Sequence, residues 1–480
     1  MPLGAPLLTP LLIAATACTG LDLDTRGETS PAVGVPSNLL ILSVDTLRRD
    51  HVSADEPWAA LSPPASEVPV TPGFFTPHLQ QRAWVLDDHA SCSNWTLHSM
   101  TCALSARSPL EWGFDQNAFC DEGDAWDDVK RDYVHLPDVL GTAGFESGIV
   151  TSNGYLGPDY LGGQGFDVVV ESGPDDDPTT RFGCRKSGRG YGAPASWVIG
   201  HGQNMLPLLA SQGDRWFLQL HFSDPHTPYI APDLEGSVFE ATAQAALPGV
   251  NLACPEEFSA ARDSYETLDV DGQAQVLAAI DAMYRAEVES LDGELAALWD
   301  WLLAEGWLDD TLVLLVADHG EQFQDHHQWG HRKSVYPEET TALAALWAPE
   351  LAPGSWDEPT LHQDLLPTVL DMLGVPAEWK GSPLALEGAI VGRASGDRVR
   401  HASFSKEDQV AHRLAQDGWV FHYDWDGSVA LFDAVEDPLE QVDLAGGEPE
   451  RVAELWDALV PYVQRTEEVL PCLAPVDPGL

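Results

Sequence analysis

The run Thr311–Ala317, TLVLLVA, restricts the fold of this chain more than any other stretch of the sequence. Its residues are almost all aliphatic and do not alternate with polar ones, which is the pattern of a strand covered on both faces. Strands of this kind belong to parallel sheets with helices above and below. The run stops on Asp318, His319 and Gly320, and ligands of such sheets bind beyond the carboxyl ends of the strands. We therefore expect chemistry at Asp318 and His319.

Two other runs share this pattern. Asn38–Asp45, NLLILSVD, reads as a buried strand with an acid at its carboxyl end, and Trp216–His221, WFLQLH, reads as a third. We interpret His221 as a core residue. Together the three runs predict an α/β fold with a mostly parallel central sheet and helices on both faces.

The charge of the chain excludes one class of partner. The 480 residues carry a formal net charge of -52, from 76 acidic residues against 24 Lys and Arg. A nucleic-acid-binding protein needs a basic face, so we expect no nucleic-acid partner. An anionic substrate would have to be held by a metal and by local donors, against the overall field.

The N-terminus has the features of an export signal. Residues 2–17 are mostly apolar and too few to span a bilayer. Ala15–Cys18 resembles a bacterial lipoprotein signal, in which cleavage leaves Cys18 lipid-modified; cleavage by an ordinary signal peptidase is the alternative. Both imply export, to the periplasm or the cell envelope, with membrane attachment only through the lipid on Cys18. Residues 1–18 are then the signal peptide, and residues 19–37 are a polar tether rich in Gly, Pro and Asp.

The remaining cysteines agree with an oxidising compartment. Six are left once Cys18 is set aside, an even number that permits up to three disulfides in any pairing. They are Cys92, Cys102, Cys120, Cys184, Cys254 and Cys472.

The segments NLLILSVDTLRRDHVS and VADHGE resemble the two metal motifs of the sulfatase family, within the alkaline phosphatase superfamily. The resemblance implies that Asp45, Asp318 and His319 hold a divalent metal. A ligand set with an imidazole and few carboxylates suits Zn²⁺ or Mn²⁺ better than Ca²⁺, and we favour a single ion. The resemblance also implies an alkaline-phosphatase-like catalytic domain over residues 38–376 and a smaller C-terminal subdomain over residues 377–480.

The segment Ser93–Pro109, SNWTLHSMTCALSARSP, is similar to the nucleophile segment of the family. The match places Thr96 at the nucleophile, where it would also contact the metal, and assigns Arg107 to substrate binding. Many family sulfatases use a formylglycine made from Cys or Ser, a route closed to Thr96. Its hydroxyl would attack directly, after activation by the metal. The alternative is that Thr96 only caps the following helix.

Other matches suggest how the substrate is held. Asn153 stands where the family has the Lys and His of GKWHLG, and it could supply one neutral donor. His226, in HFSDPHTPY, matches a histidine that contacts the substrate or the leaving oxygen. His331 lies thirteen residues after Asp318, where an imidazole could protonate a departing alkoxide. Lys333 is a further candidate for substrate contact.

The other segments are expected to build the scaffold. We predict a long helix over 276–305 whose Tyr284 and Glu287 pack or face outward, and a packing helix over 361–374. The Gly- and Pro-rich segment 167–196, with basic residues between 181 and 189, is predicted to be a loop. Strands over 413–423 and 430–433 and a helix over 449–464 predict a small antiparallel C-terminal sheet with one helix.

These expectations favour an exported, metal-dependent hydrolase that cleaves a phosphate or sulfate ester of a small molecule, a glycan or a lipid. A phospholipid headgroup transferase would share the threonine nucleophile. A surface lipoprotein with a degenerate site used for binding is the non-enzymatic alternative, and it would hold no stoichiometric metal.

Overall fold

The computed structural model describes residues 34–52, 82–109, 135–158, 160, 163–173, 192–376, 378–379, 382–383, 391, 399–406, 409–469 and 478. The predicted signal peptide with Cys18, the basic residues between 181 and 189, and Cys120, Cys184 and Cys472 lie outside this part of the chain.

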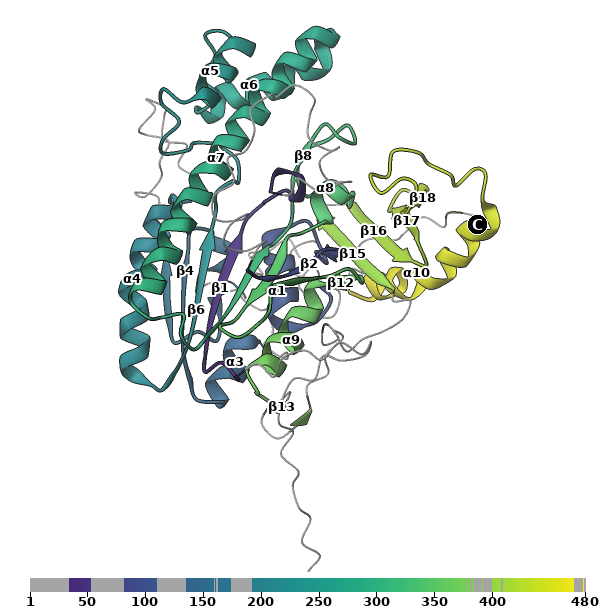
Figure 1. Ribbon diagram of the computed structural model, residues 1–480. Coiled ribbons are helices and arrows are strands. Elements are labelled where there is room, and N and C mark those ends of the chain that lie inside the picture. The colour runs from purple at the N-terminus through teal and green to yellow at the C-terminus, as the bar shows by residue number, and fades with distance from the viewer. Residues whose placement is uncertain are drawn as a thin grey trace, which may run out of the picture.

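An eight-stranded sheet forms the centre of the molecule (Figure 1). Seven of its strands run in one direction, and β10 is antiparallel to both of its neighbours. The prediction of a mostly parallel sheet is therefore confirmed. In spatial order the strands are β11 (Gly354–Trp356), β2 (Trp84–Leu86), β10 (Ala344–Trp347), β7 (Thr311–Ala317), β1 (Asn38–Val44), β6 (Arg215–Phe222), β4 (Phe145–Thr151) and β5 (Val168–Glu171).

The three apolar runs of the sequence are the three central strands of this sheet, β7, β1 and β6. Side chains alternate between the faces of a strand, and in β1 both sets are buried. Leu39 and Ile41 belong to one hydrophobic core, and Leu40 and Leu42 belong to the other. Unbroken apolar sequence is what a strand with two covered faces requires.

Helices cover both faces, as predicted. One core contains residues of α4 (Ala195–Gln212), α5 (Val238–Ala246), α6 (Pro255–Ser264) and α7 (Val270–Ala304). The other core contains residues of α1 (Thr96–Ser105), α3 (Leu136–Thr142) and α9 (Leu365–Met372). In the described part of the chain, no helix is both long and apolar enough to cross a membrane.

The long helix begins earlier than expected. The apolar periodicity predicts a start at Val276, whereas α7 begins at Val270. The side chain of Asp269 accepts the backbone N–H of Gly272 and so caps the helix. The first turn is largely exposed, so hydrophobic periodicity could not reveal it.

Part of the predicted loop over 167–196 is regular structure. Val168–Glu171 forms the edge strand β5, which pairs in parallel with β4, and α4 starts at Ala195. Three consecutive valines explain the strand, because β-branched residues favour extended backbone.

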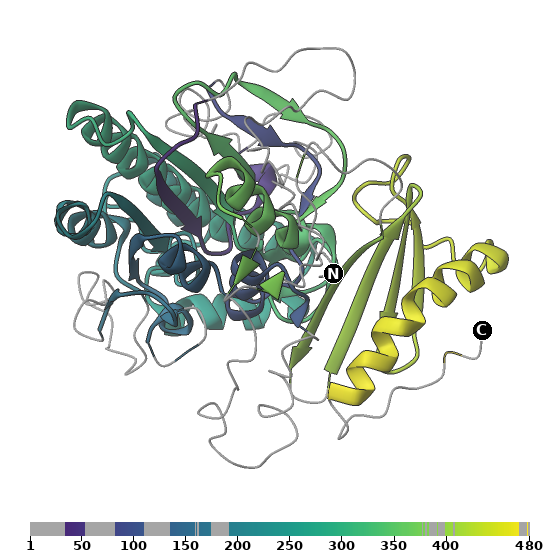
Figure 2. The same cartoon turned by 90° about the horizontal axis from the view of Figure 1, so that it is seen from below.

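The C-terminal part is a four-stranded antiparallel sheet with one helix packed across it, as predicted (Figure 2). Its strands are β15 (Arg400–Lys406), β16 (Gln409–Gln416), β17 (Trp419–Asp424) and β18 (Val429–Asp433), and its helix is α10 (Pro449–Val469). The prediction of one strand over 413–423 is wrong. Asp417 and Gly418 both have positive φ, and they form the two-residue turn of a hairpin.

Shorter elements connect these layers. They are the paired strands β3 (His89–Ala90) and β12 (Thr360–Leu361), β8 (Gln322–Phe323) and β9 (Trp329–Gly330), and β13 (Glu378–Trp379) and β14 (Ser382–Pro383), with the helix α8 (Pro337–Thr340) and 3-10 turns at Arg49–His51, Gly154–Leu156, Tyr265–Thr267 and His362–Asp364.

Hydrogen bonds join the small sheet to the main body. The N–H of Ser403 on β15 donates to the carbonyl of Cys92 at 3.0 Å. His326 joins the Glu338 carboxylate at 2.7 Å to the Glu440 carbonyl at 3.0 Å. His326 is thus engaged in linking the two parts of the chain.

Candidate metal centre and active site

The central strands deliver the first candidate residues to one edge of the sheet. In the parallel register, Val44 of β1 pairs with Ala317 of β7 and with Phe222 of β6. Asp45 and Asp318 follow these paired positions directly. The backbone N–H of Asp45 donates to the carbonyl of Phe222, and that of Asp318 donates to the carbonyl of Val44, each at 2.9 Å. The sheet register therefore fixes the two acids next to each other.

Asp45, Asp318 and His319 form a compact cluster with metal-ligand chemistry. One ligand atom of each lies within 4.8 Å of the others, and all three residues are at most 1% exposed. Asp45 Oδ1, Asp318 Oδ2 and His319 Nε2 are buried and have no hydrogen-bond partner. Buried polar atoms are nearly always satisfied, so three orphans that face one point fit a bound cation.

Local backbone geometry holds these ligands in place. Asp318 Oδ1 accepts the N–H of Thr46 at 3.0 Å and that of His319 at 2.6 Å, which leaves Oδ2 directed into the cluster. His319 Nδ1 donates to the carbonyl of Gly320 at 2.8 Å, so Nε2 carries the lone pair that a metal requires. A Cβ at Gly320 would lie 2.0 Å from the carbonyl of Glu338, which explains the glycine.

Thr96 and Asn153 join this cluster. Thr96 Oγ1 lies 3.4 Å from Asp45 Oδ2. The amide of Asn153 donates to Asp45 Oδ2 at 2.7 Å and to Thr96 Oγ1 at 3.3 Å. The structure thus brings the predicted nucleophile, the predicted neutral donor and the predicted ligands together.

Thr96 occupies the first position of α1, at the positive end of the helix dipole. Trp95, not Thr96, is the capping residue, and its side chain makes no capping hydrogen bond. The hydroxyl of Thr96 is therefore free to face the acids, contrary to the alternative that it only caps the helix.

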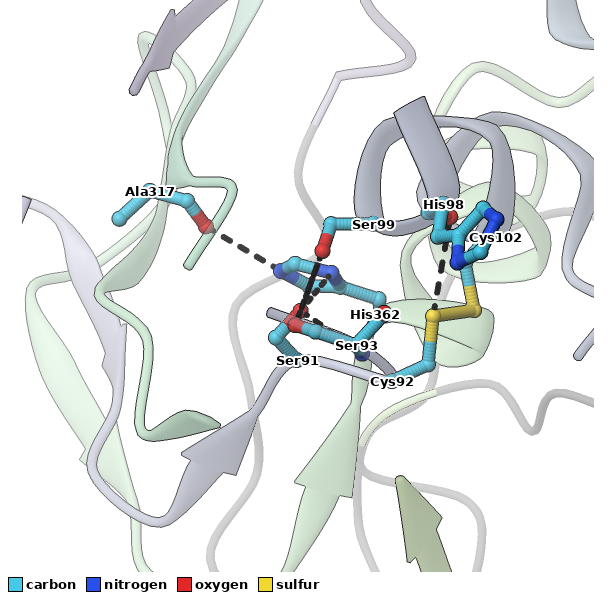
Figure 3. The surroundings of a disulfide bond; sticks show 8 residues. All are labelled: Ser91, Cys92, Ser93, His98, Ser99, Cys102, Ala317 and His362. Atoms are coloured by element: carbon cyan, nitrogen blue, oxygen red, sulfur yellow. Dashed lines mark hydrogen bonds between the residues drawn. A yellow bond between two sulfur atoms is a disulfide. The ribbon is translucent and has the colours of Figure 1, made fainter. Parts of the chain in front are cut away.

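A disulfide between Cys92 and Cys102 spans the segment that contains Thr96 (Figure 3). Cys254 is also disulfide-bonded.

Two further imidazoles stand beside the cluster. The His331 ring lies 4.7 Å from the ring of His319 and 5.2 Å from that of His226. His331 Nδ1 contacts the buried carboxylate of Glu321 at 3.3 Å, and Glu321 also accepts the hydroxyl of Tyr229 at 2.6 Å. Glu321 orients His331, a role that the sequence analysis missed although Glu321 lies next to the metal motif.

The pKa values of the two imidazoles are shifted in opposite directions. Burial lowers the pKa of His226, but the carboxylates of Asp45 and Glu321 outweigh burial and raise it above its ordinary value. Burial also lowers the pKa of His331, and the neighbouring His319 and His226 keep it at about 4 despite Glu321. At neutral pH His226 is thus the better proton donor, and His331 is neutral.

The pKa values of the two acids in the cluster are also shifted in opposite directions. Burial raises the pKa of Asp45, but His226, His221 and His319 outweigh it, and the net pKa lies below its ordinary value. Burial and the charge of Asp45 raise the pKa of Asp318 well above its ordinary value. Such mutual repulsion is what a divalent cation between the carboxylates would relieve.

The structure gives His221 a second role beside the core position predicted for it. Its ring is fully buried, but Nε2 lies 3.9 Å from Asp45 Oδ2, and Nδ1 contacts Ser43 Oγ at 3.0 Å. His221 is the second-last residue of β6, near the edge of the sheet where Asp45 and Asp318 follow β1 and β7.

A cavity of about 340 Å³ opens from Asp45. Asn153, His226 and the rings of Tyr155 and Tyr160 line it. Asp224 and Glu287 also line it. Glu287 was expected to be a packing or outward polar residue of α7, but it is 3% exposed and contacts the N–H of Ile230. Burial and Asp224 raise the pKa of Glu287 well above its ordinary value.

Two of the predicted substrate contacts are not brought to the cavity. Arg107 follows the far end of α1, a helix of ten residues, which places it roughly 15 Å along the axis from Thr96. Lys333 is exposed, and neither residue lines the cavity. Cys18 lies outside the described residues.

Comparisons with known proteins agree with this geometry. The sulfatase family model matches residues 37–375. A choline-sulfatase of Rhizobium meliloti (strain 1021) is 27% identical over 241 residues, which is 48% of this chain and 46% of the relative. An arylsulfatase of Clostridium perfringens is 23% identical over 287 residues, 57% of this chain and 59% of the relative. The chain thus spans about half the length of these curated relatives.

Solved structures show the same fold. A phosphonate monoester hydrolase from Silicibacter pomeroyi superimposes with a TM-score of 0.62 at 18% identity, covering 89% of this chain and 95% of that one. A protein solved with its substrate D-glucosamine-2-N,6-O-disulfate also gives a TM-score of 0.62, at 15% identity, covering 92% and 99%.

The family model matches well over half of the chain, over the same residues that build the sheet and the cluster. Members of this family generally bind a divalent metal, and the orphan ligand atoms of the cluster suit one. The chain belongs to the sulfatase family of the alkaline phosphatase superfamily.

Proposed function

We propose that this protein is a metal-dependent hydrolase in which Thr96 attacks a sulfate or phosphate ester directly. The observation that carries this proposal is the position of the Thr96 hydroxyl. It lies 3.4 Å from Asp45, beside three buried ligand atoms that have no partner, at the N-terminus of a helix. A poor nucleophile such as a threonine hydroxyl needs this environment to react.

Asp45, Asp318, His319 and Thr96 are the residues that would hold the ion, with Zn²⁺ or Mn²⁺ favoured. A bound divalent cation would lower the pKa of a coordinated hydroxyl and stabilise charge on the transferred group. The residues of the chain supply the remaining functions. The amide of Asn153 donates to both Thr96 and Asp45 and so fixes their relative positions, and it can donate to an oxygen of the ester.

The reaction would proceed in two displacements. The Thr96 hydroxyl gives up its proton to solvent, and its oxygen bonds to the sulfur or phosphorus while the bond to the alcohol breaks. His226, the imidazole with the raised pKa, gives its proton to the departing oxygen. Water then cleaves the ester on Thr96. His331, neutral and oriented by Glu321, is the group suited to take a proton from that water.

The charged residues that line the cavity favour an ester with a single negative charge as substrate. No Lys or Arg is among the described residues that line it, whereas Asp224 and Glu287 are. A sulfate monoester, a phosphodiester or a phosphonate monoester carries one negative charge, and a phosphate monoester carries two at neutral pH. The names of the choline-sulfatase and phosphonate monoester hydrolase relatives agree with this preference.

The test is turnover of p-nitrophenyl sulfate, bis-p-nitrophenyl phosphate and p-nitrophenyl phosphate by the full chain, with Zn²⁺ or Mn²⁺ and with chelator. We expect metal-dependent turnover, with kcat/KM at least tenfold lower for the doubly charged monoester. Thr96→Ala should abolish turnover and Thr96→Ser should retain part of it. Full activity of Thr96→Ala would reject the nucleophile, and a preference for the doubly charged ester would reject the charge argument.

A further inference from the structure

The turn that carries Thr96 and the strand that carries Asp318 are bridged by one buried imidazole, that of His362 (Figure 3). We propose that His362 is a positioning residue that fixes Thr96 relative to the metal ligands. The inference rests on the proposed function.

The first contact of His362 is to the metal strand. Its Nε2 lies 3.2 Å from the carbonyl of Ala317, the last residue of β7 and the neighbour of Asp318. A carbonyl can only accept, so the proton of the ring is on Nε2. Nδ1 must then be an acceptor.

The second contact is to the nucleophile turn. The hydroxyl of Ser91 lies 3.2 Å from His362 Nδ1 and 2.6 Å from the carbonyl of Ser93, and its single proton serves both acceptors. Ser91 Oγ is also 2.9 Å from Ser99 Oγ, and Ser99 donates to the same Ser93 carbonyl at 2.9 Å. Ser93 precedes Thr96 and Ser99 follows it, so this set of hydroxyls closes the turn around the nucleophile.

In this arrangement the His362 ring is neutral, with its proton on Nε2. His362 is fully buried, and burial lowers its pKa to about 3 even though Ala317 opposes the shift. The ring therefore stays neutral over the whole physiological pH range. A rigid connection of this kind sets the distance between Thr96 and the ligands on β7, and small displacements of a reacting group are costly in rate.

The first test compares His362→Asn with His412→Asn in the full chain. His412 is a matched control, since it is equally buried, its pKa is also about 3, and it lies in the small C-terminal sheet. With bis-p-nitrophenyl phosphate or p-nitrophenyl sulfate, His362→Asn should lower kcat at least tenfold while KM and the Zn²⁺ or Mn²⁺ content stay within twofold. His412→Asn should keep kcat within twofold. Equal kcat in the two variants would overturn the proposal.

The second test is a double-mutant cycle between His362→Asn and Ser91→Ala. If the two residues act through one chain of hydrogen bonds, the kcat of the double variant should be no lower than that of the less active single variant. Multiplied losses would show two independent effects and would overturn the bridge.

The third test does not depend on turnover. Amide hydrogen exchange over residues 91–99 should be at least tenfold faster in His362→Asn than in wild type, and unchanged in His412→Asn. If wild type turns over none of the esters, the proposed function fails, and the exchange rates still decide whether His362 holds the turn. Unchanged exchange in His362→Asn would refute the bridge whatever the activity.

Discussion

Replacing Asp318 by Asn should have opposite effects on the metal-free and the metal-loaded protein. Asp318 lies beside Asp45 in a buried cluster whose ligand atoms are within 4.8 Å of one another. Without a cation, two carboxylates at that distance repel each other by about 3 kcal/mol at an effective dielectric constant of about 20. The raised pKa of Asp318, caused by burial and by Asp45, reflects this repulsion.

An asparagine has the same shape and removes the repulsion. Its oxygen can still accept the N–H groups of Thr46 and His319, and its amide can donate toward Asp45. The unfolding entropy of a domain of roughly 340 residues is about 0.7 kcal/mol/K, so a gain of about 3 kcal/mol raises the melting temperature by about 4 °C. We expect this rise in chelator.

With metal the order should reverse. Wild type should gain about 2.7 kcal/mol when free Zn²⁺ or Mn²⁺ exceeds Kd about a hundredfold. Asp318→Asn has lost a ligand and should gain almost nothing, and it should have no activity. Differential scanning calorimetry in chelator and in metal measures both effects. Asp300→Asn, an exposed substitution of the same kind on α7, is the control and should change neither value.

The variant should melt above wild type in chelator and below it in metal, and this change of sign distinguishes a metal ligand from a structural acid. A buried acid with only a structural role would destabilise the protein in both conditions when replaced. If Asp318→Asn melts below wild type in chelator and still gains stability with metal, the cluster is no cation site.

Three other substitutions test separate parts of the structure. Asn153→Ala removes a donor to the buried carboxylate of Asp45, a bond worth about 1.5–3 kcal/mol, so kcat should fall about 10- to 100-fold; an unchanged kcat would contradict the geometry. Changing Cys92 and Cys102 together to Ala opens a short loop and should lower the free energy of unfolding by about 3 kcal/mol, the loop-closure entropy of the disulfide. Urea unfolding measures this loss, and reductant should cause no additional loss from the Cys92–Cys102 bond in the variant. Glu440→Gln should cost about 3 kcal/mol above pH 4.5, because Arg413 and His422 outweigh burial and lower the pKa of Glu440 from 4.5 to about 2. That stability is present above the unfolded pKa and disappears as pH falls through 2, so urea unfolding of variant and wild type should converge there, and a constant difference would refute the assignment.

Much of the main domain could be predicted because its strands are buried on both faces. Unbroken apolar runs such as Thr311–Ala317 announce the central strands, and the polar residues that end them announce the edge where ligands bind. The hairpin in the small sheet was missed because the two-residue turn at Asp417 and Gly418 interrupts an otherwise continuous run of strand-forming residues. The edge strand β5 was missed because its neighbours are rich in Gly, Pro and Asp.

Local sequence pattern was enough to predict the parallel sheet, the pair of acids after its central strands and, through the resemblance, Thr96. Neither Arg107 nor Lys333 is among the residues that line the cavity. The contacts of Glu321 with His331, of His221 with Asp45, and of His362 with Ala317 and Ser91 became visible only in the folded structure. The physical reason is that these contacts join residues far apart in the chain, and their direction depends on packing between layers that no local pattern records.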